Sequence, residues 1–303
     1  MVLKDYLLMI RLPNLFTIPS NIIVGYVTLQ GFPNNGLSIS LPLIIFSSCL
    51  IYTAGIIFND YSDIETDRRE KRLRPLASGS VAKRPAVILG LSCLVLALVI
   101  SGIVGPLTLL LSSIIIFIAL FYDFKLKQTK IGSIMMGSAR ASNIVYGASP
   151  ILIGGIFESV QIQRLAIESA CVFIYVVAIM LVSAREAGVA QSNPKWLFVP
   201  FLMISVVVTV MITSVILGKF KADLLGNLVI LIFIICFAVS KLTRRHKLEI
   251  SSEQIQNLVK ILVLCMVILD SSFVSGVSGL FFGTIVALFI VPGIILSRIL
   301  YVT

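Results

Sequence analysis

The chain has 303 residues, of which 58% are hydrophobic and only 13% charged, and its mean hydropathy is +1.07. A water-soluble domain of this composition would have too little polar surface to cover itself, so the composition excludes that class. The net charge of +10 does not indicate nucleic-acid binding, because the Lys and Arg residues stand in connections beside hydrophobic segments.

Ten apolar segments, bounded by charges or by Gly, Pro and Asn, follow one another along the chain. A bilayer span needs about 20 mostly apolar residues, so an all-α polytopic membrane protein with a single domain over residues 1–303 is expected. The last two segments are divided only by SGVSG and form either one broken helix or a span followed by a re-entrant piece. The predicted segments are 11–30, 38–58, 85–104, 106–122, 131–155, 164–182, 196–217, 224–240, 258–275 and 280–300.

The charged connections all fall on one side of the membrane if the segments alternate in direction. They follow the second, fourth, sixth and eighth segments, at residues 59–84, 123–130, 183–195 and 241–247. The alternate connections are short and nearly uncharged, with the two Lys of GKFKAD as the exception. The positive-inside rule therefore places the charged connections, the N-terminus and all candidate chemistry on the cytoplasmic side of the cell membrane.

Four polar side chains, Asn59, Asp60, Asp63 and Asp67, stand where the second apolar segment ends. At roughly 100° per residue, a continuing helix would place all four within an arc of about 100°. Three carboxylates on one helical face repel one another unless a cation neutralises them. Oxygen ligands with open positions suit Mg²⁺, which completes its shell with water and substrate phosphates. The pattern predicts a magnesium site formed by these four residues.

Basic residues follow the acidic ones directly, at Arg68, Arg69, Lys71, Arg72 and Arg74. They could pair with phosphate oxygens that the metal leaves free, so a diphosphate would fit between the two sets. The alternative is an exposed cytoplasmic loop in which the Asp residues merely pair with these cations. A calcium loop of the EF-hand type is excluded, since the central Gly and the closing Glu are missing.

NDYSDIETD resembles NDxxDxxxD, the first aspartate-rich motif of the UbiA superfamily of intramembrane prenyltransferases, and RPLASG resembles the continuation of that motif. Arg11, Asn14 and Asn21 resemble the polar first helix of the family. YDFKLK resembles its Tyr and Lys loop after the fourth helix, and GSARASN its polar patch in the fifth. The resemblance covers nearly the whole chain.

The resemblance implies a UbiA-like bundle of nine transmembrane helices, or ten on the segment count above, around a central cavity with a cytoplasmic cap. It also implies an enzyme that uses Mg²⁺ to hold a polyprenyl diphosphate, such as geranyl or geranylgeranyl diphosphate. The isoprenyl group would pass to a lipophilic acceptor, aromatic or lipid, within the membrane. Asp60, Asp63 and Asp67 would be the catalytic residues. The expected partners are thus the diphosphate, the acceptor and membrane lipid, without nucleic acid.

The chain departs from the family pattern at the second aspartate-rich motif. After the sixth segment it reads VSAREAGVAQSN, where Glu186 is the only carboxylate. Glu186, with Arg185 beside it, could replace the missing cluster as a metal ligand, or the site could hold one Mg²⁺ where relatives hold two. The departure also leaves open a protein that binds or transports prenyl lipids without catalysis.

Other polar residues inside the spans are expected to face a cavity or one another, because their burial in hydrocarbon is costly. Arg140 and Asn143 share a helical face; Arg140 and Lys127 are candidate diphosphate ligands and Asn143 a hydrogen-bonding residue, with an interhelical polar contact as the alternative. Asp270 is a lone carboxylate without an evident partner. The expected substrate-binding residues are Asn14, Asn21, Asn59, Arg68, Lys71, Arg72, Tyr122, Lys125, Lys127, Arg140, Asn143, Arg185 and Glu186.

Prenyl transfer requires that a C–O bond of an allylic diphosphate ionises, so the site must stabilise the leaving group and shield a carbocation from water. The rival enzyme class is a phosphatidyltransferase acting on CDP-lipids, but its Asp-Gly and Ala-Arg pattern is missing from NDYSDIETD. A transporter would be expected to contain an inverted repeat, and the sequence contains no convincing one.

Overall fold

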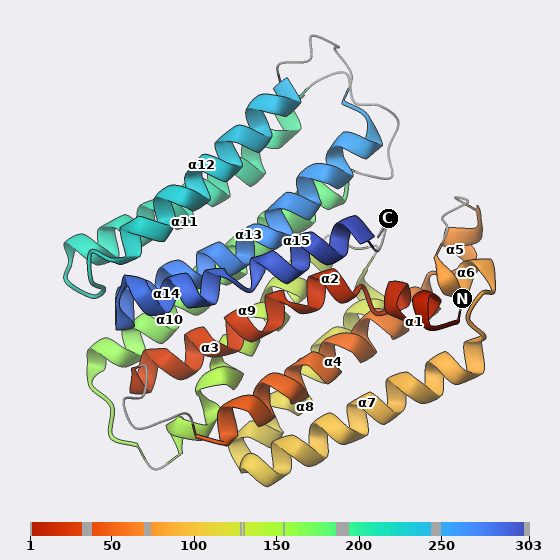
Figure 1. Cartoon of the computed structure of the whole chain (residues 1–303), viewed down its shortest axis with the longest axis horizontal. Helices are drawn as coiled ribbons and strands as arrows, with labels where there is room; N and C mark the ends of the chain where they lie inside the picture. The colour runs from red at the N-terminus through yellow and green to blue at the C-terminus, as the bar shows by residue number, and fades with distance from the viewer. Residues whose placement is uncertain are drawn as a thin grey trace.

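The computed structural model describes residues 2–31, 38–69, 74–127, 129, 131–153, 155–185, 194–243 and 250–299 (Figure 1). Its long helices lie side by side as a bundle. In chain order the elements are α1 (Val2–Met9), α2 (Leu12–Leu15), α3 (Thr17–Gln30), α4 (Ser40–Ser62), α5 (Ile64–Arg69), α6 (Pro75–Ser78), α7 (Lys83–Val104), α8 (Pro106–Phe121), the π-helix η1 (Tyr122–Leu126), α9 (Gly132–Leu152), α10 (Ser159–Ser183), the 3₁₀ helix η2 (Pro194–Leu197), α11 (Phe198–Ile216), α12 (Leu224–Thr243), α13 (Ser252–Ser278), α14 (Leu280–Ala287) and α15 (Ile290–Ile299).

Nine helical segments of the described chain are long and apolar enough to cross a bilayer. α9 is a further helix of 21 residues in the bundle, and polar residues such as Arg140 and Asn143 make it less apolar than the other nine. Each of the ten predicted segments therefore corresponds to helix, and the prediction of an all-α, multi-pass membrane protein is confirmed. The nine are Leu12–Gln30, Ser40–Ser62, Lys83–Val104, Pro106–Leu126, Ser159–Ser183, Phe198–Ile216, Leu224–Lys241, Ser252–Ser278 and Leu280–Ser297.

The sequence SGVSG separates two helices. Gly279 takes a φ of 102°, which ends α13 and lets α14 turn back against it. The packing is close, because a Cβ added at Gly283 would lie 1.8 Å from the Ser275 hydroxyl. The segment Leu280–Ser297 is long enough to span, so the interpretation as one broken helix is wrong.

Two spans form the centre of the bundle. In both Leu12–Gln30 and Ser252–Ser278, 72% of the most apolar stretch is buried, against 17% in Leu280–Ser297. The central spans carry Asn21 and Asp270, whose side chains are fully buried. Asn21 and Asp270 are thus enclosed by protein on all sides.

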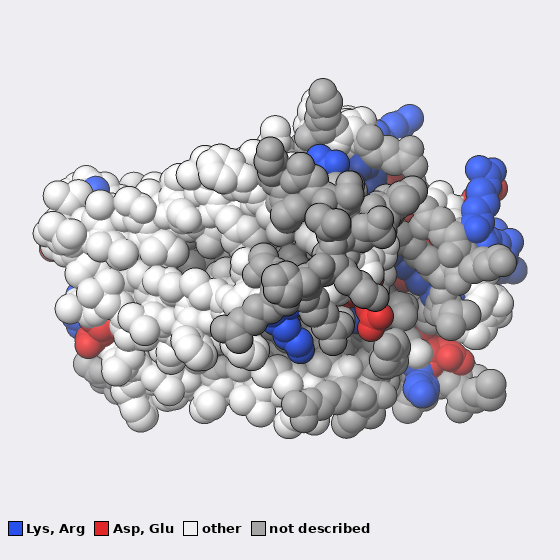
Figure 2. Space-filling model, turned by 90° about the horizontal axis from the view of Figure 1, so that it is seen from above, with Lys and Arg blue, Asp and Glu red and all other residues white. Residues whose placement is uncertain are grey.

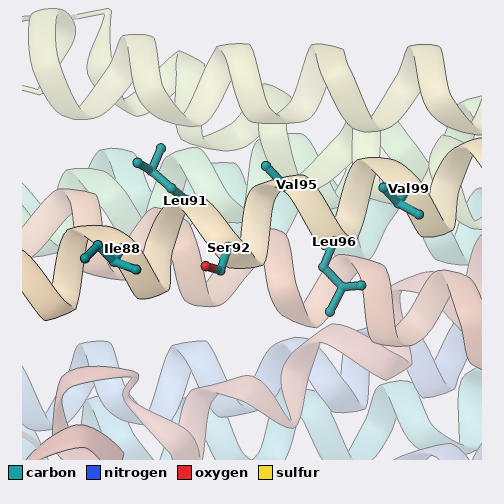
Figure 3. Close-up of a pocket in the computed structure, with 6 residues that line it drawn as sticks. All are labelled: Ile88, Leu91, Ser92, Val95, Leu96 and Val99. Atoms are coloured by element: carbon teal, nitrogen blue, oxygen red, sulfur yellow. The ribbon is translucent and has the colours of Figure 1, made fainter.

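Most of the charged side chains in Figure 2 lie toward the end of the long axis that carries α5 and α6 in Figure 1, and a few lie near the middle and at the opposite end. The outer face of α7 is largely apolar and carries an open pocket, whose lining side chains are drawn in Figure 3. Such a surface fits lipid tails and does not require a protein partner. The pocket is lined by Ile88, Leu91, Ser92, Val95, Leu96 and Val99.

Candidate functional site

The three aspartates of NDYSDIETD lie around the junction between α4 and α5. The predicted continuous helix is interrupted there, since α4 ends at Ser62 and Asp63 caps it. The helical turn nevertheless persists, because the Asp63 amide donates to the Asn59 carbonyl (3.1 Å) and the Asp67 amide to the Asp63 carbonyl (2.8 Å). The carboxylates therefore stay on one side, with Asp60 only 3% and Asp67 only 1% exposed.

Arg74 is the residue on which all three carboxylates converge. Its Nη1 atom lies 3.1 Å from Asp60 Oδ1, 3.2 Å from Asp63 Oδ2 and 3.1 Å from Asp67 Oδ2. Arg74 precedes Pro75 at the start of α6, and its extended backbone (φ −81°, ψ 142°) is the conformation that a following proline favours. Buried carboxylates need such a cation, because an unpaired buried charge is strongly destabilising.

Arg11 approaches the same cluster from the N-terminal side. Its Nη2 donates to Asp60 Oδ1 at 2.8 Å. The residue stands between α1 and α2 in the left-handed conformation (φ 48°, ψ 52°), which costs a non-glycine residue about 1 kcal/mol or more. Burial, the largest single influence, lowers the pKa of this guanidinium, but Asp60, Tyr52 and Asp67 together outweigh burial, so the pKa is raised above its ordinary value. Arg11 is therefore held against Asp60 as a cation.

Lys127 completes the ring of cations. Its ammonium donates to the side-chain oxygen of Asn59 at 2.7 Å and contacts the Asp63 carboxylate. The wide turns of the π-helix η1 connect α8 to Lys127, and Tyr122 is buried at the start of that π-helix. A π-helix in this position is typical of functional sites. The loop YDFKLK therefore reaches the acidic motif, as the predicted role of Lys127 requires.

Other predicted site residues lie away from these contacts. Arg68 is exposed and donates to the Ala77 carbonyl at 3.0 Å. Lys125 and Arg185 are also exposed, and neither forms an ion pair with a described carboxylate. Lys71, Arg72 and Glu186 lie outside the described residues, so the structure does not place the degenerate second motif.

The donor types at the junction are those that suit magnesium, although among the described residues no three His, Cys, Asp or Glu side chains are already arranged to hold a metal ion. Carboxylate oxygens and the Asn59 amide oxygen are the hard ligands that Mg²⁺ prefers. The observation that supports the fit is the position of Arg74, because three carboxylate oxygens already enclose a single positively charged group at 3.1–3.2 Å. Asn59, Asp60, Asp63 and Asp67 are the residues that would hold the ion.

A chain of hydrogen bonds runs through the membrane-embedded core beyond this cluster. Ser48 donates to Asn143 at 2.7 Å, Asn143 to Asn21 at 3.2 Å and Asn21 to Asp270 at 3.5 Å. The Ser20 hydroxyl also donates to Asp270, at 2.7 Å. The sequence showed no evident partner for Asp270, and the structure provides two from α3, which is far away in sequence.

Arg140 lies beside Tyr52 of α4, away from the acidic cluster along the helix axis. Its Nη2 donates to the Thr17 hydroxyl at 3.2 Å, and its guanidinium carbon is 5.5 Å from the centre of the Tyr52 ring. Tyr52 precedes Asn59 by seven residues on α4, which is about 10 Å along the helix. Nη1 of Arg140 is buried and has no hydrogen-bond partner within the described parts of the chain. The structure does not bring Arg140 to the acidic cluster.

Sequence reasoning missed Tyr52 and did not single out Arg74 among the basic residues. Tyr52 interacts with Arg140, whose guanidinium lies over its ring. The signal for Tyr52 was its spacing, since residues seven apart share a helical face. No comparable signal separates Arg74 from the neighbouring cations, because its role depends on the turn into α6.

A family model described as the UbiA prenyltransferase family matches residues 21–250, which is more than half of the chain. A digeranylgeranylglyceryl phosphate synthase of Ignicoccus hospitalis is 29% identical over 147 residues, covering 48% of this chain and 47% of the relative. A 4-hydroxybenzoate octaprenyltransferase of Actinobacillus pleuropneumoniae is 30% identical over 126 residues, covering 41% of each. The chain thus spans about half the length of the curated relatives it matches.

Solved structures share the fold along most of the chain. A structure described as digeranylgeranylglyceryl phosphate synthase in membranes has a TM-score of 0.62 at 24% identity and covers 91% of this chain and 98% of its own. A UbiA homologue from Aeropyrum pernix has a TM-score of 0.67 at 16% identity, covering 86% and 96%. A homologue from Archaeoglobus fulgidus bound to DMAPP and Mg²⁺ has a TM-score of 0.52 at 15% identity, covering 97% and 99%.

Proposed function

Because the chain belongs to the UbiA prenyltransferase family, we propose that it is a magnesium-dependent enzyme that transfers an isoprenyl group from a polyprenyl diphosphate to a lipophilic acceptor. The observation that carries the proposal is the convergence of Asp60, Asp63 and Asp67 on cations at the end of a membrane span. Relatives bound to DMAPP or GPP with Mg²⁺ support the donor class.

The leaving diphosphate is the group that this site must stabilise. When the C–O bond of the allylic diphosphate breaks, the electron pair leaves with the diphosphate oxygen and a carbocation remains. Bound Mg²⁺ would supply positive charge to that leaving group. Arg11, Arg74 and Lys127 carry further positive charge at the same place. Because these side chains are largely buried, water screens their charge only weakly. The acceptor then attacks the cation, and its proton is lost.

The isoprenoid tail would bind among the apolar membrane spans. α3, α4 and α9 carry polar residues such as Asn21, Asp60 and Arg140, and the rest of these helices is largely apolar. An apolar surrounding excludes water, which would otherwise quench the carbocation. We assign Arg140 and Tyr52 to binding the isoprenoid chain or the acceptor and not the diphosphate, since they lie about two helical turns from Asn59 along α4.

The acceptor class is proposed as aromatic or lipid. The two kinds of relative named above are a hydroxybenzoate prenyltransferase and a glyceryl phosphate prenyltransferase, which represent these two classes. The orientation is proposed from charge: Lys and Arg gather at the end that carries α5 and α6, so that this end faces the cytoplasm. The donor would then enter from the side where soluble diphosphates occur.

The test is a survey of radiolabelled prenyl diphosphates of several chain lengths, with and without Mg²⁺, against extracted lipid acceptors and hydroxybenzoates. Labelled product is expected from the wild type with Mg²⁺, and none after chelation or in Asp63→Ala. Diphosphate binding without any product would favour a lipid-binding protein that has lost catalysis. Neither binding nor product would refute the proposed function.

A further inference from the structure

Arg74 contacts more carboxylates than either of the other two cations. Arg11 contacts one of the three, Asp60, and Lys127 contacts one, Asp63. A single nitrogen of Arg74, Nη1, lies within 3.1–3.2 Å of oxygens from all three aspartates. That nitrogen therefore marks the point at which the three carboxylates converge.

A metal ion and this nitrogen exclude each other. Magnesium binds oxygen ligands at about 2.0–2.1 Å, so an ion shared by these carboxylates would lie inside the space that Nη1 occupies. The side chain of Arg74 is 15% exposed, so it already reaches the surface of the cluster. It has to leave the centre before a metal can take all three carboxylates.

The balance of charge in the cluster indicates what displaces the Arg74 side chain. Within the described chain, the three aspartates contact three cations, Arg11, Arg74 and Lys127, so their negative charge is already neutralised. A bare divalent ion that displaced Arg74 would leave the largely buried cluster with one uncompensated positive charge, and it would leave the Arg74 guanidinium without its three partners, which is unfavourable. A metal that arrives with a diphosphate brings anionic oxygens, and these offer Arg74 a bidentate partner.

We propose that Arg74 is a displaceable counter-ion: it occupies the metal position while no substrate is bound, and it transfers to the diphosphate when that group arrives. Metal and diphosphate then bind together, and the metal alone binds poorly. The inference rests on the proposed function for the identity of the diphosphate. The competition between Arg74 and the metal rests on the geometry of the carboxylates.

The elements around Arg74 stay in place when its side chain moves. Arg68 ties α5 to α6 through the Ala77 carbonyl, at 3.0 Å. Ile64 of α5 and Leu76 of α6 belong to one apolar cluster under these helices. Neither contact involves the Arg74 guanidinium, so the displacement requires only a change of rotamer.

The test measures metal binding without turnover. Mn²⁺, a spectroscopic substitute for Mg²⁺, is titrated into purified protein and its free signal is followed by electron paramagnetic resonance. Without diphosphate, Arg74→Gln is expected to bind Mn²⁺ roughly tenfold more tightly than the wild type, because the competing charged hydrogen bonds are gone. Arg84→Gln is the matched control: it removes one exposed cation at the start of α7, and it should bind Mn²⁺ as the wild type does.

The second arm adds a non-reactive geranyl thiolodiphosphate. The analogue is expected to strengthen Mn²⁺ binding strongly in the wild type and much less in Arg74→Gln, since the variant lacks the cation that moves to the diphosphate. If Arg74 only bound the diphosphate, Arg74→Gln would leave Mn²⁺ binding without the analogue unchanged. If Arg74 were only structural, Arg74→Gln would weaken Mn²⁺ binding both without and with the analogue. Equal or weaker Mn²⁺ binding by Arg74→Gln without the analogue therefore overturns the proposal.

Two further readouts keep the result decisive. Thermal unfolding shows whether Arg74→Gln is folded; if it is not, Arg74→Lys takes its place. That variant should show a smaller gain in Mn²⁺ affinity, because Lys lacks the rigid fork of Arg, and no gain would overturn the proposal. If the analogue changes Mn²⁺ binding in none of the proteins, the proposed function fails, while the comparison without analogue still decides the role of Arg74.

Discussion

The crossing of α3 and α9 depends on two glycines that have no room for a side chain. A Cβ at Gly25 would lie 1.8 Å from the Ile144 carbonyl oxygen, and a Cβ at Gly147 would lie 2.3 Å from the Ile22 carbonyl oxygen. Both obstacles are backbone atoms, which cannot turn away as a side chain would. Substitution of either glycine by alanine must therefore push the two helices apart.

The size of the effect follows from the shortfall in distance. Ordinary contacts of a Cβ begin at 3.4 Å, so Gly25→Ala requires a local separation of about 1.6 Å. Overpacking of this kind costs about 1–3 kcal/mol, and we expect a value near the upper end because backbone is involved. The separation would also stretch the Asn143 to Asn21 hydrogen bond, now 3.2 Å long. Gly147→Ala should destabilise the protein less.

The assay is thermal unfolding in detergent, followed with a maleimide dye that reacts with cysteines as they become accessible. Cys93, Cys171 and Cys265 are buried and report unfolding of the bundle. Gly55→Ala on α4 is the control, because nothing lies within 4 Å of the added Cβ. Alanine in a helix interior is about 0.5–1 kcal/mol more favourable than glycine, so the control should melt at the same temperature or higher. Unchanged melting of both Gly25→Ala and Gly147→Ala would refute the reasoning.

Three further predictions concern the metal ligands, the buried carboxylate and the topology. Asp63→Ala should abolish magnesium-dependent diphosphate binding in titrations, whereas Glu186→Ala should weaken it less, because the first motif contributes three carboxylates and the second only one. Equal losses would mean that the loop with Glu186 contributes as much to this binding as the first motif. Asp270→Leu should lower the melting temperature more than Asp270→Asn, since leucine removes the acceptor of the Asn21 amide, at about 1–3 kcal/mol for that buried group, and leaves the Ser20 hydroxyl with the Thr17 carbonyl as its acceptor. In a cysteine-free background, a cysteine at position 34 should react with an impermeant thiol reagent in intact cells, and one at position 74 should not; the reverse pattern would invert the proposed orientation.

The sequence predicted the helices of the bundle well, because apolar length is a strong signal in lipid. The ends of the helices were less accurate. α13 begins at Ser252, whereas the predicted segment begins at residue 258. A capping box formed by Ser251 and Gln254 sets that start, and the sequence pattern SSEQ contains its signature. The first turns of α13 are polar, so apolar patterning alone places the start of this helix too late.

The candidate site was predictable in part. The spacing of Asp60, Asp63 and Asp67 was sufficient to place them together, because it depends on one local helical turn. The contacts of Arg11 and Lys127 with them depend on packing between elements that are 49 to 68 residues apart in sequence. No local pattern encodes such contacts, and for Lys127 the family resemblance supplied the expectation. The partners of Asp270, separated by 249 and 250 residues, were not predictable in the same way.

The irregular features of the backbone lie at this same site, and this supports its assignment as the functional centre. Arg11 adopts a left-handed conformation, α4 is interrupted at Asp63, and a π-helix precedes Lys127. Each feature costs free energy relative to a regular helix, and each places a side chain in contact with the acidic cluster. Insertion into the membrane does not require these irregularities, because regular helices hydrogen-bond every backbone group within the span. The departures are therefore explained by the charged groups that they bring together.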